Sequence, residues 1–101
     1  MKIWVDGHTP PPNGFKWTRT SWEAIEMLRK GRCIYISLDY HLGNVQDCGD
    51  GYMVACWIET QTVNRKLKER IDWHCHCKSV VGKKIIESAL RNADAVWNKL
   101  I

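Results

Sequence analysis

Aspartate and histidine side chains follow three short apolar runs of this chain, and their types could support acid–base or metal chemistry. The set comprises Asp6, His8, Asp39, His41, His74 and His76. All four histidines of the chain belong to it. Imidazole exchanges protons near neutral pH, and carboxylates bind cations or hold an imidazole in place. This pattern is typical of a hydrolytic or metal-binding site, although a histidine at a strand end can also serve only as a hydrogen-bond partner.

The apolar runs must be strands for these side chains to meet. We expect strands over 2–5, 33–38 and 71–77, each followed by a helix. Alternating strands and helices predict a parallel sheet with right-handed crossovers and helices on both faces, an α/β three-layer sandwich with the first strand in the middle. Ligands of such sheets bind beyond the carboxyl ends of the strands, which is where the acidic and imidazole groups lie.

Capping residues mark the three expected helices. Thr20 and Glu23 form a capping box, and Gly31 is a typical residue just past a helix end. Asp50 and Ser79 can cap the second and third helices. The helical spacing places Trp57 and Trp97 on buried faces. Between the first strand and the first helix, the three prolines at 10–12 predict a stiff loop without regular structure, with Phe15 and Trp17 covering one end of the core.

The start of the third helix could bind phosphate. Lys78, Ser79, Gly82 and Lys83 surround this helix start, where free backbone N–H groups favour anions and a glycine permits close approach. The alternative is an ordinary helix cap with solvated lysines. Trp17 and Tyr40 could stack on a base, whereas Trp4 is expected in the core.

A divalent metal ion is a second possible ligand of the same edge. We expect Asp6, Asp39 and His41 to hold it, with Mg²⁺, Mn²⁺ and Zn²⁺ as the candidate ions. The run 74–77 has the residue types of a zinc site, but neighbours on a strand point to opposite faces. We therefore expect Cys75 and Cys77 to be reduced and not joined to each other.

Composition narrows the remaining possibilities. The 101 residues suffice for one domain, the net charge of +4 suits an anionic ligand, and basic and aromatic residues do not alternate in a way that indicates nucleic-acid binding. We expect no membrane span, because the sequence contains no apolar run of the required length. Five cysteines without a secretory signal argue against a disulfide framework. We expect a cytoplasmic protein. The oligomeric state stays open.

At these same residues the chain resembles the family of cyclic-phosphate-processing receiver-like domains. The matching segments are Val5–Phe15, Arg19–Ala24, Ser37–Gly43, Gly51–Val54 and His76–Gly82. The resemblance implies one receiver-like, flavodoxin-like domain over 1–101, with its site at the strand ends and Asp6, Asp39, His76 and Gly82 among the retained positions.

Several family positions carry other residues here. Gly7 stands where the family has a second aspartate, His41 replaces another acid, and Met53 replaces the aspartate of the second helix. Either the site has been rebuilt around histidines, or catalysis has been lost and a binding site remains.

The resemblance leads to two main functional hypotheses. In the first, the domain is a phosphodiesterase acting on cyclic phosphates or cyclic nucleotides. Asp6, Asp39 and His41 would hold the metal ion, His76 would be the general acid, and the third helix would hold the phosphate. In the alternative, a degenerate receiver-like domain binds or sequesters a phosphate-containing small molecule or nucleotide, or serves as a protein-interaction module.

Overall fold

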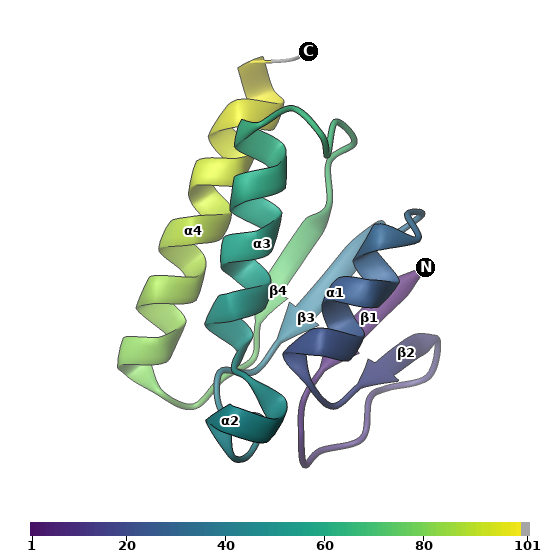
Figure 1. Cartoon of the computed structure of the whole chain (residues 1–101), viewed down its shortest axis with the longest axis vertical. Helices are drawn as coiled ribbons and strands as arrows, with labels where there is room; N and C mark the ends of the chain where they lie inside the picture. Colours follow the sequence, from purple (N-terminus) through teal and green to yellow (C-terminus); the bar gives the residue numbers. More distant parts are fainter. Residues whose placement is uncertain (100–101) are drawn as a thin grey trace.

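The structure is a computed structural model and describes residues 1–99 of the chain. Strands and helices alternate along most of it (Figure 1). The elements are β1 (Lys2–Val5), β2 (Phe15–Thr18), α1 (Ser21–Arg29), β3 (Tyr35–Leu38), α2 (Val45–Cys48), α3 (Gly51–Val63), β4 (Asp72–Cys75) and α4 (Val80–Lys99).

The strands form one parallel sheet in the order β2-β1-β3-β4. The central place of β1 is confirmed, because Lys2 pairs with Phe15 of β2 on one side and with Tyr35 of β3 on the other. Phe15 and Trp17, which we expected to cover one end of the core, lie in the edge strand β2, which we did not predict. A four-residue edge strand after a proline-rich loop carries too little apolar alternation to be recognised from sequence.

The predicted helix caps are confirmed. The side chains of Thr20, Asp50 and Ser79 each accept a hydrogen bond from the backbone N–H three residues later. Gly31 follows the end of α1 with a φ of +79°, a left-handed conformation that glycine adopts without steric cost. Between β3 and α3 the chain forms the short helix α2, which Asn44 caps.

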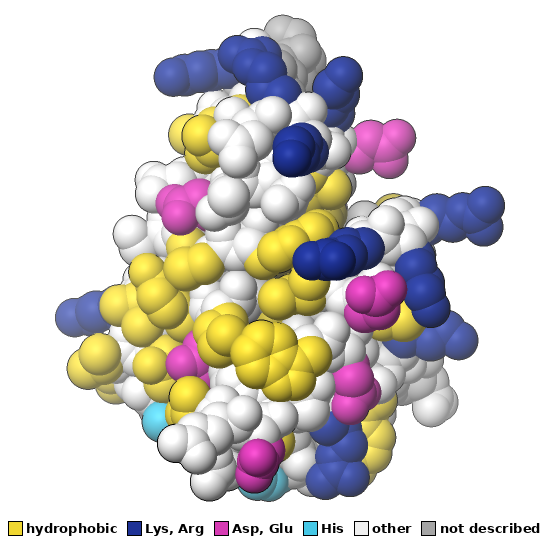
Figure 2. Space-filling model, viewed as in Figure 1, with side chains coloured by type: hydrophobic (Ala, Val, Ile, Leu, Met, Phe, Trp, Pro, Cys, Tyr) yellow, Lys and Arg dark blue, Asp and Glu magenta, His cyan; other side chains and the backbone are white. Residues whose placement is uncertain are grey.

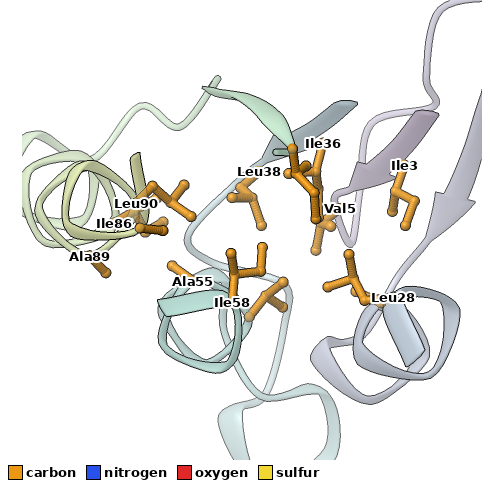
Figure 3. Close-up of a cluster of buried hydrophobic side chains, with 14 of the residues drawn as sticks. Ile3, Val5, Leu28, Ile36, Leu38, Ala55, Ile58, Ile86, Ala89 and Leu90 are labelled. Atoms are coloured by element: carbon orange, nitrogen blue, oxygen red, sulfur yellow. The ribbon is translucent and has the colours of Figure 1, made fainter. Parts of the chain in front are cut away.

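The helices α1 and α3 lie against the same face of the sheet (Figures 1 and 3). Chain direction explains this arrangement, because the crossovers β2 to β3 and β3 to β4 run the same way across the sheet, and crossovers between parallel strands are almost always right-handed. The crossover from β1 to β2 runs the opposite way. It consists of segment 6–14, which reaches the second face where Thr9 accepts a hydrogen bond from Trp4. On this face the segment and aromatic side chains of the strands stand where we expected helices.

Apolar side chains of the strands pack against the helices on the first face (Figure 3). Ile3, Val5, Ile36 and Leu38 are fully buried there. Trp97 is 2% exposed and Trp57 packs partly buried against the same core, which agrees with the predicted helical faces. The receiver-like α/β class is thereby confirmed.

All five cysteines are free, so Cys75 and Cys77 are not joined, as predicted. Within residues 1–99, no helix combines the length and apolar character needed to cross a membrane.

Candidate functional site

A cavity of about 500 Å³ opens at the carboxyl ends of β1, β3 and β4. Its walls are formed by Trp4, Asp6, His8, Thr9, Asp39, His41, His76, Lys78 and Ser79. Figure 2, seen from the helix side, shows imidazoles at the end of the molecule where α2 lies and many Lys and Arg side chains at the opposite end. The cavity therefore lies at the strand ends where the sequence places the acidic and imidazole groups.

Most of the expected site residues line this cavity. They are Asp6, Asp39, His41, His76, Lys78 and Ser79. Gly82 and Lys83 are not part of its wall. His74 is exposed on β4 and also lies outside the wall, because it points to the face opposite that of the buried Cys75.

A chain of hydrogen bonds fixes His76 at the floor of the cavity. Its Nε2–H donates to Oδ2 of Asp6 at 3.1 Å, and its Nδ1 lies 2.7 Å from the hydroxyl of Ser37. When the ring is neutral and Nε2 carries the proton, Nδ1 accepts from that hydroxyl. Ser37 is 2% exposed and was not expected in the site, because its partner is distant in sequence.

Asp6 is held as a carboxylate. Its Oδ1 accepts from the backbone N–H groups of His8 and Thr9 at 2.8 and 2.9 Å. Burial alone would raise the pKa of Asp6, but the hydrogen bonds from Thr9, His8 and His76 outweigh burial and lower this pKa below its ordinary value. The carboxylate thus anchors both segment 6–14 and the imidazole of His76.

Trp4 completes the enclosure of His76. The indole and imidazole rings stack with centroids 3.9 Å apart and planes inclined by 5°. The indole Nε1–H donates to the carbonyl oxygen of Thr9 at 2.8 Å. Trp4 was expected in the core, but its neighbours Ile3 and Val5 face the helices, so strand alternation turns Trp4 to the other face.

These contacts bear on the role expected of His76. Both of its ring nitrogens already have partners, so it could give a proton to a ligand only by releasing Asp6. His8 and His41 are exposed, and within residues 1–99 neither imidazole forms a hydrogen bond. His8 and His41 are therefore accessible to a ligand in the cavity, whereas His76 is already held by Ser37 and Asp6, and its role as general acid stays a prediction.

The remaining polar groups of the wall come from β3 and the start of α4. Asp39 is half-buried, and its Oδ1 accepts the backbone N–H of Tyr40 at 2.8 Å. Ser79 caps α4 through its hydroxyl, and Lys78, which precedes it, is exposed. The cavity thus has a cationic ammonium group beside the N-terminus of a long helix, an arrangement that favours an anion.

Two glycines in the segments that resemble the family serve close packing here. A Cβ built on Gly7 would lie 1.8 Å from the carbonyl oxygen of Leu42, so no side chain fits at the position of the family's second aspartate. A Cβ on Gly82 would lie 2.6 Å from the ring of Tyr40. Gly82 therefore allows the close approach of Tyr40, whereas we expected it to allow the approach of a phosphate, and Tyr40 lies outside the cavity wall.

The residues of the site do not fit a metal ion in this arrangement. In the described chain, 1–99, no three His, Cys, Asp or Glu side chains gather closely enough to hold one. Asp6, in particular, already accepts three hydrogen bonds. A divalent ion at Asp6, Asp39 and His41 stays a prediction.

The fold and the cavity define a receiver-like α/β domain with a polar site at the carboxyl edge of its sheet. A sequence model of the family described as the cyclic-phosphate processing receiver domain matches residues 1–92, so the chain belongs to this family. No curated protein and no solved structure matched the chain significantly.

Proposed function

We propose that this domain binds a cyclic phosphodiester in the cavity and opens it by hydrolysis, with His8 and His41 transferring the protons. The observation that carries the proposal is that one cavity combines these two exposed imidazoles with the ammonium group of Lys78. The family description adds independent support, since it refers to the processing of cyclic phosphates.

The chemistry follows from the residue types in the wall. Water attacks phosphorus while one imidazole accepts its proton, and the P–O bond to one ring oxygen breaks. The second imidazole protonates that oxygen, and the product is a phosphomonoester. Lys78 offsets the negative charge that grows on the phosphoryl oxygens. Asp6 and His76 take no proton in this scheme and keep the floor of the cavity rigid.

The test is hydrolysis of adenosine 2′,3′-cyclic monophosphate followed by ³¹P NMR, with and without added Mn²⁺ or EDTA. We expect His8→Gln and His41→Gln each to lower kcat by about 100-fold or more, because general acid–base catalysis contributes that much. His74→Gln is the matched control, since His74 is exposed and lies outside the cavity.

Loss of activity in EDTA would contradict the metal-independent scheme and favour the ion predicted at Asp6, Asp39 and His41. If wild type shows no turnover under any condition but binds the nucleotide with saturable heat that Lys78→Met abolishes, the alternative hypothesis of a sequestering domain replaces hydrolysis. Equal activity of His8→Gln, His41→Gln and His74→Gln would contradict the assignment of the two imidazoles.

A further inference from the structure

The second face of the sheet carries aromatic side chains that segment 6–14 covers only in part. Strand alternation and register turn Trp4 of β1, Phe15 of β2 and Tyr35 of β3 to this face, opposite the buried Ile3 and Ile36. All three aromatic residues are half-buried. We call Trp4, Phe15 and Tyr35 the aromatic face.

The rings of the aromatic face form one continuous surface. Trp4 and Phe15 meet edge to face with centroids 5.6 Å apart, and Phe15 and Tyr35 do the same at 5.9 Å. The ammonium group of Lys2 lies 5.7 Å from the centre of the Phe15 ring. The surface is therefore apolar and polarisable, with a cation beside it.

This surface is continuous with the cavity. Trp4 belongs to both, because its indole stacks on His76 and also lines the cavity wall. Trp4 and Lys78 both line the cavity, so a ligand whose phosphate lies beside Lys78 can extend toward Trp4. The group that fits there must be flat and largely apolar if it is to replace water on the aromatic face.

We propose that the aromatic face is a subsite for the base of a nucleotide whose phosphate occupies the cavity. The proposal rests on the proposed function and deepens it, because it makes a nucleotide, and not a cyclic phosphate on an arbitrary alcohol, the ligand of this domain. Aromatic side chains on a four-stranded sheet are a general means of binding unpaired bases, since every base presents a π-face.

The charges around the surface agree with this ligand. Lys78 lies in the cavity and Lys2 at the beginning of β1, so cations stand at both ends of the path that a nucleotide would follow. The acid on this side of β4 is Asp72, and it is exposed and paired with Arg70 at 3.7 Å. The aromatic face could not be predicted from the sequence, because its residues lie on three strands and meet only through the sheet register.

The test compares three probes by isothermal titration calorimetry. Adenosine 2′,3′-cyclic monophosphate has base and phosphate, glycerol 1,2-cyclic phosphate lacks the base, and adenosine lacks the phosphate. Binding is measured with His41→Gln in the background so that the cyclic probes stay intact. The proposal expects the nucleotide to bind about tenfold more tightly than glycerol cyclic phosphate, in keeping with the contribution of one base–aromatic stack.

Phe15→Leu and Tyr35→Leu keep apolar volume and remove the π-face. Each change should lower the affinity for the nucleotide by about fivefold or more and leave the affinity for glycerol cyclic phosphate unchanged. Tyr52→Leu is the control, because Tyr52 is an exposed aromatic residue on α3, outside the cavity. As a measurement that needs no variant of the face, the indole Nε1–H signal of Trp4 should shift with the nucleotide more than with glycerol cyclic phosphate.

The outcomes separate this proposal from the proposed function. Equal affinity for the nucleotide and glycerol cyclic phosphate, with no effect of Phe15→Leu or Tyr35→Leu, overturns the base subsite while the phosphate site stands. If adenosine binds as tightly as the nucleotide and Lys78→Met changes neither, the phosphate site fails. Such a result would show only that the base stacks on the aromatic face. It would overturn the proposal that base and phosphate of one nucleotide are bound together.

Discussion

The imidazole of His76 lies parallel to the indole of Trp4, with ring centroids 3.9 Å apart. Ser37 occupies one ring nitrogen and Asp6 the other, so the imidazole is held both at its face and at its edges. Because both ring nitrogens of His76 have partners, we expect this imidazole to stabilise the fold. Mutations of the residues that contact it should therefore lower the free energy of unfolding.

Ser37→Ala should lower the free energy of unfolding by about 1–2 kcal/mol. The change leaves Nδ1 of His76 without a partner in a buried setting, and an unmade hydrogen bond there costs about this much. Urea denaturation measures the loss, and the ¹⁵N shifts of His76 should report a changed tautomer population. Ser88→Ala, at an exposed position on α4, is the control and should change stability by less than about 0.5 kcal/mol. Equal stability of the two variants would show that the contact contributes nothing.

Asp6 should make the stability of the domain fall in acid. Its pKa in the folded state is below the ordinary value of 3.8, because the hydrogen bonds from Thr9, His8 and His76 outweigh burial. The stabilisation is therefore complete above that ordinary value and is lost as the pH falls through the lower folded value. Unfolding curves between pH 7 and pH 2.5 should show this loss in wild type.

Asp6→Asn should lower the free energy of unfolding at pH 7 by about 1–3 kcal/mol, because its amide cannot accept all the bonds that the carboxylate accepts. The variant should also lack the part of the acid dependence that Asp6 supplies. Asp47→Asn, at an exposed site on α2, should retain it. The assignment to Asp6 is refuted if Asp6→Asn and wild type lose stability in parallel from pH 4 to pH 2.5.

Gly7→Ala should destabilise the domain strongly. A methyl group at this position would lie 1.8 Å from the carbonyl oxygen of Leu42, which is backbone and must shift to make room. We expect a loss of about 2–3 kcal/mol in thermal or urea unfolding. Gly14→Ala introduces a residue at a φ of +93° where nothing lies within 4 Å, so it measures the cost of backbone strain without a clash and should lose less.

Gly7→Asp restores the aspartate typical of the family and should be at least as destabilising as Gly7→Ala. A stable Gly7→Asp variant that gains affinity for Mg²⁺ would contradict the view that this position now serves packing.

Gly82 and Tyr40 should show a strong coupling in a double-mutant cycle. Gly82→Ala places a methyl group 2.6 Å from the Tyr40 ring and should cost about 1–3 kcal/mol. In the background of Tyr40→Ala the same change should cost nothing or stabilise α4, since alanine is the better helix former. Additive effects would mean that the ring does not press on Gly82.

The sequence predicted the positions of the site better than their roles. Asp6, Asp39, His41 and His76 could be placed together because parallel strands end at the same edge, which is a property of the fold class. The partner of each side chain depends on rotamers and on contacts distant in sequence. The Ser37 hydroxyl at His76 is such a contact, and no local pattern announces it.

Strand β2 and the aromatic face could not be predicted for a related reason. Phe15 and Trp17 form a strand because β1 pairs with them, and no local pattern indicates this pairing. The face of the sheet on which Trp4 lies depends on the burial of Ile3 and Val5 against the helices. The caps at Thr20, Asp50 and Ser79 were predictable because their hydrogen bonds reach only three residues along the chain.

The short crossover 6–14 also bears on the order in which this domain assembles. The pairing of Lys2 with Phe15 closes only this short segment, whereas the pairing of Lys2 with Tyr35 on the other side of β1 closes a longer loop. Closing a shorter loop loses less chain entropy, and folding is faster when contacts are local. We therefore expect the β1–β2 pair to form before the rest of the sheet. Because this loop carries Asp6, His8 and Thr9, which line the cavity, we expect one wall of the cavity to form with the β1–β2 pair, before β4 brings His76 to it.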